Sequence, residues 1–313
     1  MIHAKSLRID YEDLTAVHDL DIEIKPGQIY GLVGPNGAGK TSTIKALAGI
    51  LEPTYGEIKL ADIDLDLDPE NALRKLGYMP DFPPVYENLK VWEYLDVFAT
   101  AYLIERKERK NRVEHWLQKV DLTGKRDTFI RDLSRGMRQR LVLAKTLLHE
   151  PSVLLLDEPA SGMDPIARME LRKMLKECAD RGAAVLISSH ILTELSDFCN
   201  AIGIMEKGRM IVSGTIDEIR TRIGSKGHLI VRLAMVEDKT RAKLQRVLSQ
   251  SHLIHNLREE LPGRFRGIFN GVDLEAAQLL NDLIANDLSI AEFHVEKENM
   301  EDIFLKVGAK EVS

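Results

Sequence analysis

Short, mostly apolar runs alternate with helical stretches along the larger, N-terminal part of the chain. The runs at 29–33, 153–156 and 185–188 are bounded by polar or glycine-containing turns. An uninterrupted apolar run is typical of a strand that is buried on both faces, as in a parallel sheet. Strands that alternate with helices indicate an α/β fold. We therefore predict an α/β domain over residues 1–222.

A helical insert interrupts this pattern between residue 82 and about residue 126. It opens with 80–84, a proline-rich segment that is too stiff to continue a helix. Beyond that segment, apolar residues recur at the spacing of one helix face. They are Val91, Tyr94, Leu95 and Phe98 in a first group, and Val113, Trp116, Leu117 and Val120 in a second. The spacing predicts helices that lie between two strand-bearing parts of the domain.

A second domain begins after the small polar linker at 224–227. Beyond it the pattern predicts a strand, a helix, two strands, a helix and a strand. Their expected ranges are 228–235, 238–250, 252–257, 264–270, 273–286 and 288–296. The order βαββαβ is that of the split βαβ, ferredoxin-like arrangement. We predict a small α+β domain over 223–313 with a dimerisation or regulatory role, and a final short helix at 300–307.

Charge and composition narrow the possible partners. The chain has 43 basic and 49 acidic side chains, a net charge of −6, whereas nucleic-acid binders usually carry a basic excess. We therefore expect no nucleic-acid partner. The N-terminus lacks an apolar signal core, and no run approaches the ~20 apolar residues of a spanning helix. We expect a soluble protein, which another chain would have to hold at a membrane. The two cysteines, Cys178 and Cys199, are expected to be buried thiols.

A glycine-rich loop follows the predicted strand at 29–33. Residues 34–41 fit the pattern G-x-x-x-x-G-K-[ST], and a helix is predicted to follow from 42 to 48. In such a loop, backbone amides converge on phosphate oxygens, and the helix N-terminus adds positive potential. Lys40 would place its charge on the β and γ phosphates, and Thr41 would offer its hydroxyl to Mg²⁺. The predicted phosphate-binding residues are Gly34, Asn36, Gly37, Ala38, Gly39, Lys40, Thr41 and Ser42.

Two carboxylates, Asp157 and Glu158, end the buried strand at 153–156. Ligands of open parallel sheets bind at that carboxyl end. Asp157 is a candidate Mg²⁺ ligand, and Glu158 a candidate general base for an attacking water. His190 follows a third strand, where it could donate a hydrogen bond to a γ-phosphate. Taken alone, the carboxylates could be an ordinary charged strand end, and a lone histidine is more often structural.

A second anion site is predicted at the start of another helix. Ser134 is a natural N-cap for the apolar helical pattern that continues through Leu141, Ala144, Leu147 and Leu148. One chain with two phosphate-binding helix ends permits a reciprocal dimer, in which each serine helix completes the other chain's site. Simple capping of a structural helix is the alternative, and for this motif alone it is the better one.

Together these motifs resemble those of the ATP-binding cassette (ABC) ATPases. The resemblance covers roughly residues 1–220: an aromatic at Tyr11, the loop at 34–41, a helical insert, a signature at 133–137, the strand with two carboxylates, a D-loop at 161–164 and His190. It implies the P-loop NTPase fold with a mixed sheet core and a helical subdomain of about 82–150. It also implies that Tyr11 stacks on adenine, that Ser134 and Gly136 contact the γ-phosphate of the opposite protomer, and that Asp164 couples the two sites.

The chain departs from the family pattern at three positions. Arg135 and Met137 replace the third and fifth residues of the usual Leu-Ser-Gly-Gly-Gln signature, but the two residues expected to touch phosphate are kept. Asp81 stands where the family usually has glutamine. Its carboxylate could still reach Mg²⁺ or its water, but cannot donate a hydrogen bond when ionised.

The resemblance is greatest to single-cassette ATPase subunits of the type-2 export group. It implies an ATP- and Mg²⁺-dependent homodimer on the inner face of the membrane, which powers a separate permease through the helical insert. The alternative is a soluble ABC-type ATPase that acts on ribosomes or DNA. DNA-repair members split the cassette with a long coiled coil, whereas about 90 residues separate Lys40 from the signature here. Ribosome-associated members usually carry two cassettes.

Overall fold

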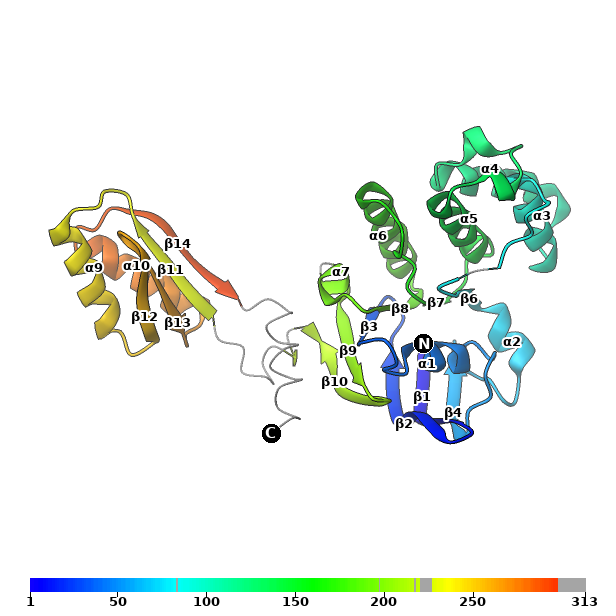
Figure 1. The fold of residues 1–313 in the computed structure, drawn as a ribbon, viewed down its shortest axis with the longest axis horizontal. Coiled ribbons are helices and arrows are strands. Elements are labelled where there is room, and N and C mark those ends of the chain that lie inside the picture. The colour runs from blue at the N-terminus through cyan, green and yellow to red at the C-terminus, as the bar shows by residue number, and fades with distance from the viewer. Residues whose placement is uncertain (83, 197, 217, 220–226, 298–313) are drawn as a thin grey trace. The chain divides into compact units, whose positions relative to one another are not determined.

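The computed structural model describes residues 1–82, 84–196, 198–216, 218–219 and 227–297 (Figure 1). The chain forms two compact units, Met1–Ile216 and Asp217–Ser313. The predicted boundary at 222 and the predicted final helix at 300–307 both lie outside the described residues. Within the described ranges, no helix has the length and apolar character needed to span a bilayer.

An antiparallel sheet opens the first unit. It is formed by β1 (Ile2–Tyr11), β2 (Leu14–Ile24), β4 (Tyr55–Leu60) and β5 (Ile63–Asp64), in the order β2-β1-β4-β5. Buried and more exposed positions largely alternate along β1 and β2, as in a sheet with one face on the core. The prediction of strands alternating with helices was therefore wrong for this segment, where two long strands follow each other directly.

The second sheet has six strands and carries the predicted apolar runs. Its order is β10 (Arg209–Thr215), β9 (Ala201–Glu206), β3 (Ile29–Val33), β8 (Ala184–Ser189), β7 (Val153–Leu156) and β6 (Leu76–Met79). All neighbours are parallel except β10, which is antiparallel to β9. Every residue of β3, β7 and β8 is buried, which explains their unbroken apolar sequence. The predicted mixed sheet core is confirmed.

Helix α1 (Lys40–Leu47) packs in one core with residues of both sheets. Its Ile44 and Leu47 belong to the cluster that also contains Leu20 of β2 and Leu186 of β8. The remaining helices of this unit are α2 (Pro69–Arg74), α3 (Val91–Ala101), α4 (Arg106–Lys119), α5 (Arg135–Leu147), α6 (Pro165–Asp180) and α7 (Leu192–Ser196), with short 3-10 turns at Thr123–Lys125 and Ile130–Asp132. Helices α3, α4 and α5 form a group of their own in Figure 1, as expected for the helical subdomain of about 82–150.

The second unit has its own core under a four-stranded antiparallel sheet. Its elements are β11 (Gly227–Leu233), α9 (Asp238–Gln250), β12 (Ile254–Leu261), β13 (Arg264–Phe269), α10 (Asp273–Ala285) and β14 (Ile290–Lys297), with strand order β12-β13-β11-β14. The order βαββαβ is as predicted. Two strands are displaced: β12 extends to Leu261, and β14 begins at Ile290 rather than 288. Leu288 is buried, but its amide closes the end of α10 by donating to Leu283 O.

Candidate functional site

A pocket of about 700 Å³ opens where β3, β7 and β8 end. The structure brings eleven of the predicted site residues to its wall: Tyr11, Asn36, Gly37, Ala38, Gly39, Lys40, Thr41, Ser42, Asp81, Glu158 and His190. These residues come from segments that are far apart in sequence. Gly34 and Asp157 are buried and are not among the described residues that line the pocket. The pocket therefore unites the glycine-rich loop with the carboxylates and the histidine that were predicted separately.

The glycines of the loop are required by close backbone contacts. A Cβ on Gly34 would lie 2.3 Å from Met205 O, and one on Gly39 would lie 2.5 Å from Ala16 O. Gly39 also has φ of 100°, which disfavours any residue with a side chain. Helix α1 begins directly after it, without a side-chain hydrogen bond at its N-cap. Amides of its first turn are therefore available to an anion in the pocket.

Lys40 is the buried cation of the pocket. It is 6% exposed, and its Nζ donates to Gly34 O at 2.7 Å. Oε1 of Glu158 lies 3.7 Å from the same Nζ, and the Glu158 side chain is 15% exposed. A charge removed from water needs an opposite charge or several hydrogen bonds. The phosphates of a nucleotide would provide further anionic oxygens at this position.

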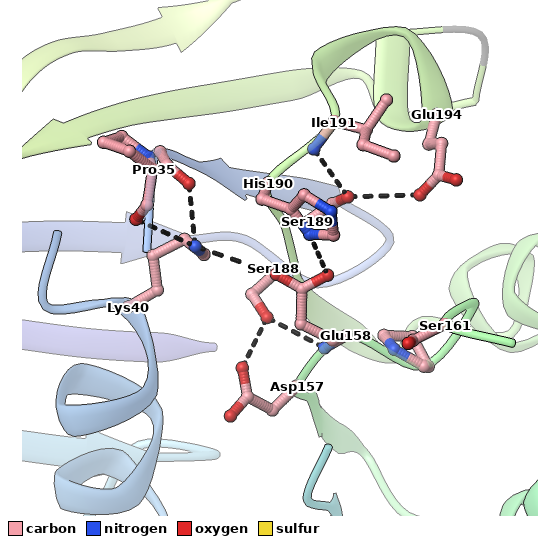
Figure 2. Close-up of polar contacts among 12 residues, drawn as sticks. Pro35, Lys40, Asp157, Glu158, Ser161, Ser188, Ser189, His190, Ile191 and Glu194 are labelled. Carbon is pink, nitrogen blue, oxygen red and sulfur yellow. Dashed lines mark hydrogen bonds and ion pairs between the residues drawn. The ribbon is translucent and has the colours of Figure 1, made fainter. Parts of the chain in front are cut away.

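One hydroxyl fixes both carboxylate residues of the strand end (Figure 2). Ser188 Oγ donates to Asp157 Oδ1 at 2.6 Å and accepts from the amide of Glu158 at 2.9 Å. Asp157 is 1% exposed, so its carboxylate is held away from bulk water. Sequence analysis missed Ser188, because its role depends on β8 lying beside β7. A buried carboxylate of this kind is a suitable ligand for a hard divalent cation.

The side chains of His190 and Glu158 are in direct contact in the wall of the pocket. His190 Nδ1 lies 2.9 Å from Glu158 Oε2, while the imidazole remains 49% exposed. Glu158 adopts φ of 48°, a left-handed conformation that is uncommon for a residue with a side chain. The carboxylate of Glu158 lies between Lys40 and His190 (Figure 2). Because the imidazole and the carboxylate are in direct contact, a water molecule or a phosphate oxygen would bind beside this acid–base pair.

Asp81 and Tyr11 lie on the rim of the pocket. Burial raises the pKa of Asp81, and the negative charges of Asp157 and Glu158 raise it further. A positive ion between these carboxylates would relieve their repulsion. Tyr11 is 41% exposed, and its hydroxyl lies 3.3 Å from Ser42 Oγ. Its ring is accessible at the mouth of the pocket, where a nucleotide base can stack.

Ser134, Gly136 and Asp164 are not among the described residues that line the pocket. Ser134 caps α5, as predicted, and accepts from the amide of Met137 at 3.3 Å. Asp164 caps α6 by accepting from the amides of Ile166 and Ala167, and the bond from Ala167 lowers its pKa most. Within one chain Ser134 and Asp164 therefore cap helices, and all three residues lie outside the pocket.

Further pocket residues were not predicted from the sequence. Ser161, His18, Lys207 and Gly208 all line the wall. Gly208 also supports the loop, because its amide donates to Ala38 O at 3.0 Å. This turn is distant in sequence from the loop it contacts, so no local motif indicates its role. Ser161 was part of the predicted D-loop, but not of the predicted site.

The comparisons with known proteins agree with this geometry. A family model described as "ABC transporter" matches residues 17–161. The bacitracin transport ATP-binding protein BcrA of Bacillus licheniformis is 32% identical over 300 residues, covering 95% of this chain and 94% of BcrA. This chain belongs to the ABC transporter family. The BcrA match is longer than the first unit, so the similarity to that ABC transporter protein extends into the second unit.

Other matches cover a smaller share of the chain. A probable multidrug ABC transporter ATP-binding protein of Escherichia coli, YbhF, is 34% identical over 222 residues. That match covers 71% of this chain but 38% of YbhF, so the chain spans less than half of that relative. A solved structure titled "Structure of ATP binding subunit of ABC transporter" has a TM-score of 0.68 and 32% identity, and the match covers 72% of this chain and 93% of that one. The first unit thus has the ABC ATPase fold.

Proposed function

We propose that this chain binds and hydrolyses ATP as the nucleotide-binding subunit of an ABC exporter. The observation that carries the proposal is the convergence of Lys40, Glu158 and His190 in one pocket beside the uncapped N-terminus of α1. The same site therefore contains positive groups that can bind a triphosphate and a carboxylate that can accept a proton from water. Membership of the ABC transporter family supports the link to transport.

The residues divide the chemistry among them. The loop amides and Lys40 hold the phosphates, and Tyr11 stacks on the adenine. Glu158 accepts a proton from the attacking water, while His190 donates a hydrogen bond to the γ-phosphate. Thr41, Asp157 and Asp81 are the oxygen donors that would hold Mg²⁺, which supplies positive charge against the phosphates when bound. The buried carboxylate of Asp157 beside Ser188 Oγ suits such an ion.

A second copy of the chain would complete the site. Ser134 and Gly136 lie at an exposed helix start outside the pocket, so their amides and hydroxyl are open to a neighbour's nucleotide. In this dimer the γ-phosphate is held by Lys40 of one protomer and the α5 N-terminus of the other. Asp164 lies in the segment that would link the two sites.

Export through a separate permease is supported by the relatives' names. They include a bacitracin transport protein and a Nod factor export protein of Cupriavidus metallidurans, the latter 33% identical over 70% of this chain. The permease would bind the helical insert, which places this chain on the cytoplasmic face of the membrane. The substrate of transport would contact the permease.

The test combines turnover with capture of the partner. Glu158→Gln protein with ATP, added to detergent-solubilised membranes, is expected to retain a polytopic membrane protein, whereas Lys40→Ala protein is not. Wild-type protein should hydrolyse ATP, and chelation of Mg²⁺ should stop it. Capture of ribosomes or DNA in place of a membrane protein would contradict the transport role. Absence of Mg²⁺-dependent turnover in the presence of the captured partner would contradict the ATPase role.

A further inference from the structure

An ion pair outside the pocket joins two segments that border it. Arg168, near the start of α6, has its Nη1 2.6 Å from Oε1 of Glu194 in α7. The two side chains are 38% and 15% exposed, so the pair is partly shielded from water. Neither residue is among the described residues that line the pocket. The pair can therefore affect the pocket only through the segments to which Arg168 and Glu194 are hydrogen-bonded.

Arg168 holds the segment 161–164. Its Nε donates to Met163 O at 3.1 Å, in addition to the ion pair made by Nη1. Ser161 of the same segment lines the pocket, and its Oγ lies 3.4 Å from Arg135 Nη2 at the start of α5. The guanidinium of Arg168 thus connects the segment 161–164, which borders the pocket, to α7.

Glu194 holds the turn that carries His190. Its Oε2 accepts from Ser189 Oγ at 3.2 Å, and the same Oγ accepts from the amide of Ile191 at 3.0 Å. Figure 2 shows both bonds meeting at the hydroxyl of Ser189, and Ser189 and Ile191 flank His190 in sequence. Ser189 is 3% exposed, whereas the His190 imidazole is 49% exposed. Besides its hydrogen bond to Glu158, the half-exposed imidazole is positioned by the backbone of this turn, which these hydrogen bonds hold.

We infer that the Arg168–Glu194 pair is a positioning clamp, which fixes His190 beside Glu158 and so sets the rate of hydrolysis rather than nucleotide affinity. The inference rests on the proposed function, in which Glu158 and His190 act on the water and the γ-phosphate. Displacement of a reacting group by about 1 Å can cost a hundredfold in rate. Glu194 contributes nothing to the phosphate loop, so loss of its charge leaves the binding of ATP unchanged.

Three variants isolate the clamp. Glu194→Gln keeps the shape of the side chain but removes the charge that pairs with Arg168. Ser189→Ala removes only the hydroxyl that links Glu194 to the His190 turn, and it guards against a folding defect in the first variant. Glu177→Gln is the matched control, because Glu177 lies on the same helix as Arg168 and pairs with Lys119 at 2.9 Å, with 38% and 35% exposure, away from the pocket.

Turnover and affinity are measured separately with purified full-length protein, using trinitrophenyl-ATP as the binding probe. Glu194→Gln is expected to lower kcat by about tenfold or more, and Ser189→Ala by less. The Kd for the probe should stay within about twofold of wild type in both, since the loop amides and Lys40, which hold the phosphates, are left in place. Glu177→Gln should match wild type. An unchanged kcat in Glu194→Gln, or a loss of affinity equal to the loss of kcat, overturns the clamp.

A second readout does not depend on turnover. In protein labelled with ¹³C-histidine, the His190 imidazole signal is identified by its absence in His190→Gln. That signal should shift in Glu194→Gln and in Ser189→Ala, but not in Glu177→Gln. A signal that stays in place in the first two variants overturns the clamp even if no variant hydrolyses ATP. Absence of turnover in wild type contradicts the proposed function instead, so the two failures are distinguishable.

Discussion

The helices α1 and α5 begin in opposite ways, although both were predicted to bind phosphate. Helix α1 follows Gly39 without a side-chain cap, and Lys40 is buried at its first position. Helix α5 follows Ser134, whose side chain caps it at an exposed end. The first helix start lies in the pocket with the carboxylates, and the second lies outside it. One half of a phosphate site is therefore assembled within the chain, whereas in the dimer that we propose the other half acts on the nucleotide of the second copy.

The difference between the two helix starts predicts that nucleotide binding and ATP hydrolysis depend on different helices. A site that is complete in one chain should bind nucleotide as a monomer. Catalysis that needs the start of α5 should require two chains. Changes at the first helix should therefore reduce affinity, and changes at the second should reduce turnover and dimerisation with little effect on affinity.

The largest effect on nucleotide affinity is expected at the first helix, from Lys40→Ala. The substitution removes the buried cation that would pair with phosphate, a loss of about 3 kcal/mol or more, or about 100-fold in Kd. Titration with a fluorescent ATP analogue measures it. Lys45→Ala is the control, because Lys45 lies in the last turn of the same helix and does not line the pocket. Equal affinity of the two variants would refute the assignment of the site.

Glu158→Gln should separate binding from hydrolysis. Loss of a general base typically costs 10²–10⁴-fold, so turnover should fall by roughly 10³-fold while the Kd for ATP is retained. Because the nucleotide is bound but not cleaved, light scattering should detect an ATP-dependent dimer that wild type shows only transiently. Rapid turnover by this variant would exclude Glu158 as the base.

At the second helix, the effect of Ser134→Ala can be compared with the loss of a similar N-cap elsewhere in the protein, that of Asp68. Ser134 and Asp68 each accept from one backbone amide at 3.3 Å, at the starts of α5 and α2. Removal of either cap should cost about 1 kcal/mol of stability, but only Ser134→Ala should lower turnover, by roughly tenfold.

Complementation tests the reciprocal dimer directly. A mixture of Ser134→Ala and Lys40→Ala proteins should hydrolyse ATP faster than either alone. In a mixed dimer, one site combines the intact Lys40 of the first chain with the intact Ser134 of the second. Turnover no greater than the sum of the separate proteins would show that the two helix starts do not share a nucleotide.

The smallest effect is expected from Asp81→Asn. The pKa of Asp81 is raised in the folded protein, so ionisation of its carboxyl lowers the free energy of unfolding. This loss of stability develops as the pH rises through the raised pKa. In Mg²⁺-free protein near pH 7, the variant should melt about 1–2 °C higher than wild type, and the difference should shrink in acid. Asp66→Asn, at an exposed carboxylate, is the control. A lower melting temperature for Asp81→Asn would contradict this assignment of charge repulsion.

The sequence predicted best what is encoded locally. The bounds of β3 and β7 follow from uninterrupted apolar runs, and the Ser134 cap follows from a serine before a helical pattern. Contacts between distant segments were not predictable in this way. The hydroxyl of Ser188 reaches Asp157 only because β8 lies beside β7, and strand order is not written in either strand. The long strands β1 and β2 were missed because a half-buried strand has a weaker signal than an apolar run.

At Glu158, the backbone conformation lowers the stability of the fold, while the side chain is the proposed base for hydrolysis. A residue with a side chain pays a conformational penalty there of order 1 kcal/mol, which glycine would avoid. Laboratory selection for heat tolerance alone should therefore favour glycine or asparagine at this position, at the expense of the carboxylate. On the proposed function, thermostable descendants of this protein would lose ATP turnover unless the selection also required that turnover.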